Sequence, residues 1–119
     1  VSACYYNNLG ISYNMINRPE WAQECFEKAI SINPNFFEYY QNLVKTYKCR
    51  NALQSNLDKY KDSLKKNNNN SIAWLFLGMI YEEMGMKKEA VNAFTRYAKL
   101  EPYVILADAV NKHLEELKK

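Results

Sequence analysis

The sequence predicts an all-α fold in which helix pairs follow one another along the chain. Apolar residues recur with the 3.6-residue period of a helix, one set of residues occurs twice, and turn-forming residues separate the segments. No segment alternates apolar and polar residues at the period of two that marks a strand. With 119 residues, 48% of them hydrophobic, the chain is long enough to bury a core. We therefore expect residues 1–119 to form a single domain.

A set of seven residues recurs at a fixed spacing. Each residue of the first set has a matching residue 68 positions later, and 68 is twice the period of about 34 residues known for one class of helical hairpin. The spacing predicts a further copy between the two, over residues 37–70. The two sets are Tyr6, Leu9, Gly10, Tyr13, Ala22, Phe26 and Pro34, and Trp74, Leu77, Gly78, Tyr81, Ala90, Phe94 and Pro102.

These residues resemble the signature of the tetratricopeptide repeat, W-x2-L-G-x2-Y followed by A-x3-F and P. The resemblance implies an α-solenoid, a right-handed superhelix of three helix pairs. The pairs are expected at about residues 3–36, 37–70 and 71–104, with a capping helix over 105–119. It also implies that the first helix of each pair lines a concave groove that takes a peptide or a partner helix.

The middle copy departs from the signature. Val44 stands where the outer copies have glycine, Asn56 where they have alanine, and Asn68 where they have proline. Small residues let two helices approach closely, so we expect looser packing and the earliest local opening in this copy. Its residues that stay in phase with the signature are Tyr40, Leu43, Tyr47 and Tyr60.

Seven helices are expected, each ending at turn-forming residues. Pro19 suits a first helical turn, Gly85 suits a helix end, and a further break is expected at Glu101-Pro102. Four asparagines at positions 67–70 are expected to form the loop before the fifth helix, and Ser71 is expected to cap that helix. The expected ranges are about 3–15, 19–31, 36–49, 52–66, 71–84, 87–100 and 104–117, and the last has one apolar face, as a terminal cap needs.

Catalytic chemistry is not indicated by any residue pattern. His113 is the only histidine. The carboxylate pairs Glu82-Glu83 and Glu115-Glu116 are adjacent in sequence, so their members point about 100° apart on a helix and cannot flank one bond. The three glycines lack phosphate-loop spacing. We therefore expect no enzyme activity, no catalytic residue, no cofactor and no metal ion.

Three cysteines, Cys4, Cys25 and Cys49, are widely spaced and form no metal-binding pattern. We expect free, buried thiols and a cytoplasmic or other intracellular location. No apolar run approaches the roughly 18 residues that span a bilayer, and no signal-peptide pattern opens the chain. Association with a membrane is therefore not expected.

The net charge of +3 resides in the middle copy. Residues 37–70 contain seven basic and three acidic residues, including Lys45, Lys48 and Lys61. No nucleic-acid motif accompanies them, so nucleic acid is not expected as a partner. Two interpretations remain open, a solvated helix face and a surface for an acidic protein partner.

The resemblance places the candidate groove on the first helix of each pair, opposite its packing face. The groove would change from amide to cationic to apolar side chains along the chain. Either the apolar residues of the fifth helix pack within the stack, or they form a patch for a partner. The expected groove residues are Asn7, Ile11, Asn14, Gln41, Asn42, Lys45, Lys48, Ile72, Leu75, Phe76, Met79 and Glu82.

One known groove of the family binds the acidic carboxyl terminus of heat-shock chaperones through lysines, asparagines and an arginine. That clamp would require Lys at Asn7, Asn at Ile11 and at Asn42, Lys at Ile72 and Arg at Phe76. Only Asn42 has the required side chain, so this use of the fold is not expected here.

These observations predict a protein-interaction or scaffold module that binds a peptide or helix, with an acidic stretch in the partner. A second interpretation is a non-catalytic accessory repeat region of a larger enzyme or transferase. Self-association through the N-terminal end, where no polar cap precedes the first helix, is a third.

Overall fold

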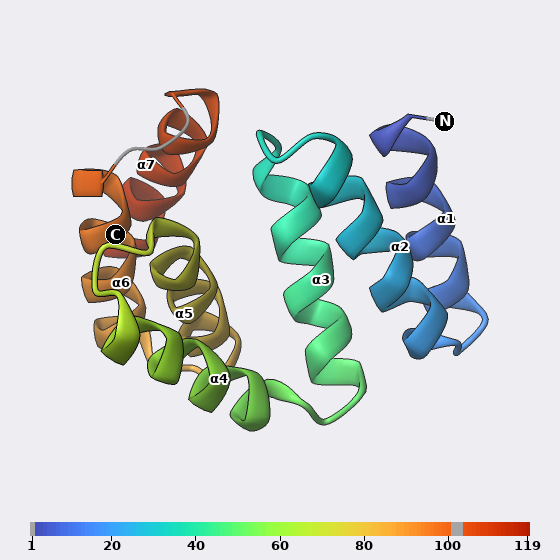
Figure 1. Cartoon of the computed structure of the whole chain (residues 1–119), viewed down its shortest axis with the longest axis horizontal. Helices are drawn as coiled ribbons and strands as arrows, with labels where there is room; N and C mark the ends of the chain where they lie inside the picture. The colour runs from blue at the N-terminus through green and yellow to red at the C-terminus, as the bar shows by residue number, and fades with distance from the viewer. Residues whose placement is uncertain (1, 101–103) are drawn as a thin grey trace. The chain divides into compact units, whose positions relative to one another are not determined.

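The computed structural model describes residues 2–100 and 104–119, which form seven α-helices and no strand. Every described helix end lies within one residue of the expected position, while the break expected at Glu101-Pro102 lies outside the described residues. The helices are α1 (Ala3–Met15), α2 (Pro19–Ile32), α3 (Phe37–Cys49), α4 (Leu53–Lys66), α5 (Ser71–Glu83), α6 (Lys87–Leu100) and α7 (Val104–Lys118) (Figure 1).

The chain divides into two compact units, Val1–Ala52 and Leu53–Lys119. Unit 1 therefore holds α1 to α3, and unit 2 holds α4 to α7. The boundary falls inside the expected middle copy of the repeat, between its two helices. That residues 1–119 act as a single domain remains a prediction.

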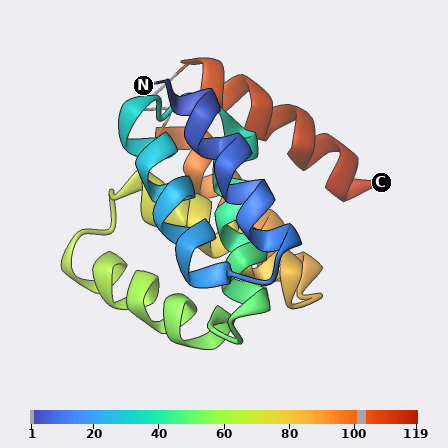
Figure 2. The same ribbon diagram turned by 90° about the vertical axis from the view of Figure 1, so that its right-hand side faces the viewer.

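In unit 1, α1 and α2 form an antiparallel hairpin, and α3 packs on α2 and also contacts α1. Figure 2 shows α1 in dark blue alongside α2 in lighter blue. Ser2 caps α1, because its Oγ accepts a hydrogen bond from the backbone N–H of Tyr5 at 3.1 Å. Asn17 turns the chain with a φ of 61°, a conformation that asparagine tolerates, and Pro19 begins α2 as expected.

The two helices of the unit 1 hairpin approach each other closely because Gly10 has no side chain. A Cβ atom on Gly10 would lie 2.7 Å from Cε1 of the Phe26 ring, closer than real Cβ contacts. Phe26 and Ala22 are fully buried on the facing side of α2. The expected close approach at this glycine is therefore confirmed.

Unit 2 contains an equivalent hairpin, α5 with α6. A Cβ atom on Gly78 would lie 2.7 Å from Cδ1 of Phe94. α4 packs on α5, and α7 packs on α6 with Leu106 and Val110 fully buried. The apolar face expected for the last helix is thus used for packing.

Two sequence-based expectations for local details are wrong. The N-cap of α5 is Asn70, whose Oδ1 accepts a hydrogen bond from the N–H of Ala73 at 3.2 Å, and Ser71 is the first residue of the helix. Of the three cysteines expected to be buried, only Cys25 is, since Cys4 and Cys49 are exposed. Within the described part of the chain, no helix is both long and apolar enough to cross a membrane.

Candidate functional site

The facing sides of α1 and α3 in unit 1 are joined by side-chain amides. Asn42 Nδ2 donates to Asn7 Oδ1 at 2.9 Å, and Asn14 Nδ2 donates to Thr46 Oγ1 at 2.9 Å. The Thr46 hydroxyl donates in turn to the carbonyl oxygen of Asn42 at 2.9 Å. The structure thus brings three predicted groove residues together, and it adds Thr46, which the sequence analysis missed. These directional bonds fix the register of α3 against α1.

Other predicted groove residues of unit 1 remain accessible. Ile11 lies one helical turn after Asn7 and is 37% exposed. Lys45 and Lys48 on α3 are exposed, and Gln41 is half-buried. Asn7 itself is only 5% exposed, so its carboxamide positions Asn42 and is not available to a partner.

The predicted groove residues of α5 are mostly core residues. Leu75, Phe76 and Met79 are 0%, 5% and 3% exposed, while Ile72 is half-buried. The Phe76 ring stacks on the Tyr60 ring of α4, with centroids 4.7 Å apart and planes at 3°. Burial therefore favours the packing alternative for this apolar face, since a partner can contact only exposed atoms.

Glu82, the last predicted groove residue, joins α5 to the final helix. Its Oε1 lies 2.6 Å from Nε2 of His113 on α7, and both side chains are half-buried. The His113 ring also meets the Phe94 ring edge-to-face at 5.6 Å. The lone histidine therefore has a structural role in docking α7 on the hairpin.

The described residues contain no group of three or more histidine, cysteine or acidic side chains placed to hold a metal ion. Burial raises the pKa of the Cys25 thiol, and Glu24 raises it further, so this thiol is not activated as a nucleophile. The pKa of Tyr39 is raised by burial and by nearby Cys4 and Glu38.

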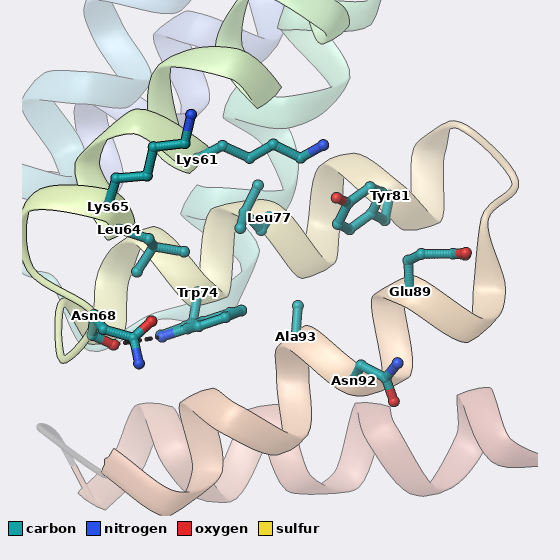
Figure 3. Close-up of a pocket in the computed structure, with 10 residues that line it drawn as sticks. All are labelled: Lys61, Leu64, Lys65, Asn68, Trp74, Leu77, Tyr81, Glu89, Asn92 and Ala93. Atoms are coloured by element: carbon teal, nitrogen blue, oxygen red, sulfur yellow. Dashed lines mark hydrogen bonds between the residues drawn. The ribbon is translucent and has the colours of Figure 1, made fainter.

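Unit 2 holds a recess between α4, α5 and α6, with a volume of about 500 Å³ (Figure 3). Its walls are largely apolar. The Trp74 indole is held there by a hydrogen bond of 2.9 Å from its Nε1 to the carbonyl oxygen of Asn68. The apolar lining residues are Leu64, Trp74, Leu77, Tyr81 and Ala93.

The rim of the recess is polar, with two lysines and one glutamate. Lys61 and Lys65 project from α4, and Glu89 and Asn92 come from α6. Trp74, Leu77 and Tyr81 were identified from the sequence only as repeat-signature residues, so this recess was not predicted. The available signal was the pair of lysines four residues apart, which places both on one side of α4.

Comparison with protein-family models decides the classification. Models described as tetratricopeptide repeat match residues 3–36 and 71–103, together more than half of the chain. The chain belongs to the tetratricopeptide-repeat family. The matched segments are the two hairpins built around Gly10 and Gly78, so the family predicted from the sequence is confirmed.

Known proteins resemble the chain at low identity. The protein bimA of Emericella nidulans is 26% identical over 94 residues, which cover 79% of this chain but 12% of that relative. The Arabidopsis OM64 tetratricopeptide domain is 22% identical, with a TM-score of 0.52 and coverage of 96% and 94%. PcrH of Pseudomonas aeruginosa, solved in complex with the chaperone-binding region of PopD, is 16% identical, with a TM-score of 0.57 and coverage of 96% and 89%. These solved structures confirm the all-α helical-repeat fold.

Proposed function

We propose that the face shared by α1 and α3 binds a protein partner as an extended peptide or a helix. The observation that carries this proposal is the amide network, which holds the two helices in register while Ile11, Lys45 and Lys48 stay exposed. A fixed surface loses little conformational entropy when it binds. Membership of the repeat family supports the proposal, as does PcrH, which was solved with a bound region of another protein.

The exposed charges favour an acidic partner. Lys45 and Lys48 lie one turn apart on α3, and Glu38 is the only acidic residue of that helix. Arg50 just beyond α3 donates to Gln23 Oε1 at 2.6 Å and is therefore already engaged. A partner with carboxylates beside an apolar side chain would meet the two lysines and Ile11 together.

A charge-reversal experiment tests this surface. Peptides rich in aspartate and glutamate are selected by display on the purified chain, and their Kd values are measured by fluorescence anisotropy at several salt concentrations. We expect Lys45→Glu with Lys48→Glu to weaken binding about tenfold at low salt and less at high salt, because salt screens exposed charges.

The matched control is Lys28→Glu on α2, an exposed lysine of the same unit. It should leave Kd unchanged apart from the general effect of lowering the net charge by two. If the control and the α3 variants weaken binding equally per charge, the effect is only net charge and the proposed surface is wrong.

Self-association is a second candidate function, supported by the apolar groups exposed on the α1–α2 hairpin. Trp21 is 51% exposed and stacks edge-to-face on Tyr13 at 5.4 Å, and Tyr5 and Met15 are also exposed. Sedimentation velocity over a wide concentration range should show dimers that Trp21→Ser abolishes. A chain that sediments as a monomer at the highest concentration would exclude this function.

A further inference from the structure

We infer that the recess between α4, α5 and α6 is a second docking site, separate from the α1–α3 face. Its occupant is a linear peptide that inserts one bulky apolar side chain between the helices and carries carboxylates beside that side chain. The inference concerns unit 2 alone and does not depend on the proposed function of unit 1.

The size and lining of the recess fit such a side chain. Its volume of about 500 Å³ lies within the range of about 300–1,000 Å³ typical of ligand sites. Trp74 and Tyr81 present aromatic rings, and Leu64 and Leu77 add aliphatic wall (Figure 3). Apolar surface of this kind gains free energy when an inserted side chain displaces water.

The recess is not filled by folding of the hairpin itself. Trp74 and Tyr81 are signature residues of the α5–α6 hairpin that remain half-buried, as their counterparts Tyr6 and Tyr13 do in unit 1. Arg96 lies over the Trp74 ring, with its Cζ 5.2 Å from the ring centroid. Bulky aromatic groups are thus left partly open beneath cationic side chains, which is an arrangement for an incoming group.

The charges on the rim indicate that the flanking groups of the peptide are acidic. The Nζ atom of Lys61 lies 5.8 Å from the centroid of the Tyr81 ring, and Lys61 makes no ion pair with any described residue. Lys65 has only Asp62, at 3.8 Å, and both side chains are more than two-thirds exposed, so that pair contributes little. Glu89 is the single acidic residue of the lining. A carboxylate of the peptide can therefore pair with either lysine without displacing a strong contact.

The structure supplies its own reporter for a binding test, because the chain has two tryptophans and one lines the recess. The exposed Trp21 is replaced by phenylalanine, so that all tryptophan emission comes from Trp74. The probes are capped hexapeptides whose central residue is phenylalanine, leucine or a non-fluorescent analogue of tryptophan. Aspartates or glutamates flank this residue, and the set of peptides covers every position that they can take. Matched peptides carry a central alanine or flanking lysines.

We expect at least one acidic, apolar-centred peptide to change the emission of Trp74 saturably. Replacement of its central residue by alanine, or of its acids by lysine, should weaken binding at least tenfold. Lys61→Glu with Lys65→Glu should weaken it at least tenfold as well. Lys59→Glu with Lys66→Glu places the same charge change on the same helix outside the recess and should alter Kd by less than threefold. Circular dichroism checks that both double variants keep their helices.

Several outcomes would overturn the inference. These are the absence of any responding peptide, equal effects of the two double variants, or tighter binding of the lysine-flanked peptides. Emission that changes with protein concentration alone would identify a second copy of the chain as the occupant, and a stronger response to a single-stranded oligonucleotide would identify nucleic acid. The variant Lys45→Glu of unit 1 should leave peptide binding in the recess unchanged, which separates this test from that of the proposed function.

Discussion

The two repeat hairpins share one framework but differ in what covers their first helix. Gly10 meets Phe26 in unit 1 as Gly78 meets Phe94 in unit 2, with the same closest approach. On the other side, α1 presents two asparagines and one isoleucine where α5 presents three large apolar side chains. The counterparts, 68 residues apart, are Asn7 and Leu75, Asn8 and Phe76, and Ile11 and Met79.

This difference separates the two uses of a helix hairpin. On α1, the buried Asn7 forms a hydrogen bond that aligns α3, whereas Asn8 and Ile11 stay exposed. Such a bond contributes only about 1 kcal/mol. On α5, the same positions are buried, and burying a phenylalanine contributes about 1.5–3 kcal/mol. The amide face is suited to an exposed binding surface, whereas the apolar face serves the core of unit 2.

The largest expected effect comes from exchanging counterpart residues for alanine. Phe76→Ala should lower the free energy of unfolding of unit 2 by about 3–5 kcal/mol, because it leaves a cavity beside Tyr60. Asn8→Ala, at the exposed counterpart on α1, should change the free energy of unfolding of unit 1 by less than about 0.5 kcal/mol. Urea titrations followed by Trp74 emission in the Trp21→Phe background report unit 2, and helix content reports the whole chain. Equal effects at the two positions would contradict the comparison.

The next prediction concerns the shared framework. Gly10→Leu and Gly78→Leu should each lower the free energy of unfolding by about 1–3 kcal/mol, because the new side chain collides with the facing phenylalanine ring. Gly85→Ala is the control, since no atom lies within 4 Å of its Cβ position and only its φ of 78° is unfavourable. It should cost about 1–2 kcal/mol by conformation alone. Thermal unfolding of the three variants measures these effects, and a neutral Gly10→Leu would show that the hairpins are not equivalent.

The framework was predictable because each part of it depends on local sequence. Helix ends follow from proline, glycine and asparagine between periodic segments, and the glycine contacts follow from the repeat spacing. Asn70 replaced Ser71 as the cap because either residue can accept the bond and the sequence does not show where the first turn begins.

The covering of each hairpin was less predictable, because it depends on contacts between helices. The Tyr60–Phe76 stack and the bond from Asn42 to Asn7 join residues 16 and 35 positions apart, and Phe76, Asn42 and Asn7 do not belong to the repeat signature. The periodicity placed Phe76 on the groove side of α5, but only the position of α4 shows that the ring is covered. The recess was missed for the same reason, since its walls come from three helices.

A smaller effect tests whether the amide network sets the register of α3. Asn7→Leu introduces the residue type of its counterpart Leu75, and it should cost about 1–2 kcal/mol because Asn42 loses its acceptor. Asn7→Leu with Asn42→Leu should recover most of that loss, because replacing both partners leaves no polar group unpaired. Chemical denaturation of the two single variants and the double variant gives the coupling energy. Additive losses would mean that the bond contributes nothing specific.

The smallest expected effect separates the two helices of the middle copy. The sequence predicts that this copy opens first, and burial now distinguishes its halves. In α3, six residues are buried, among them Tyr40, Leu43 and Tyr47, whereas α4 has only Leu57 and Leu64. Local opening costs less where fewer apolar side chains are buried.

We therefore expect amide hydrogen exchange to be at least tenfold faster in α4 than in α3, a difference of about 1.4 kcal/mol in opening free energy. Exchange is followed residue by residue by NMR, and exchange of α1 and α5 within their hairpins provides the reference for each unit. Leu57→Ala should increase the exchange of α4 further and leave α3 unchanged, because the two helices belong to different units. If the amides of α4 outlast those of α3, burial does not govern local opening here, and the departures of the middle copy from the repeat signature have no consequence for its stability.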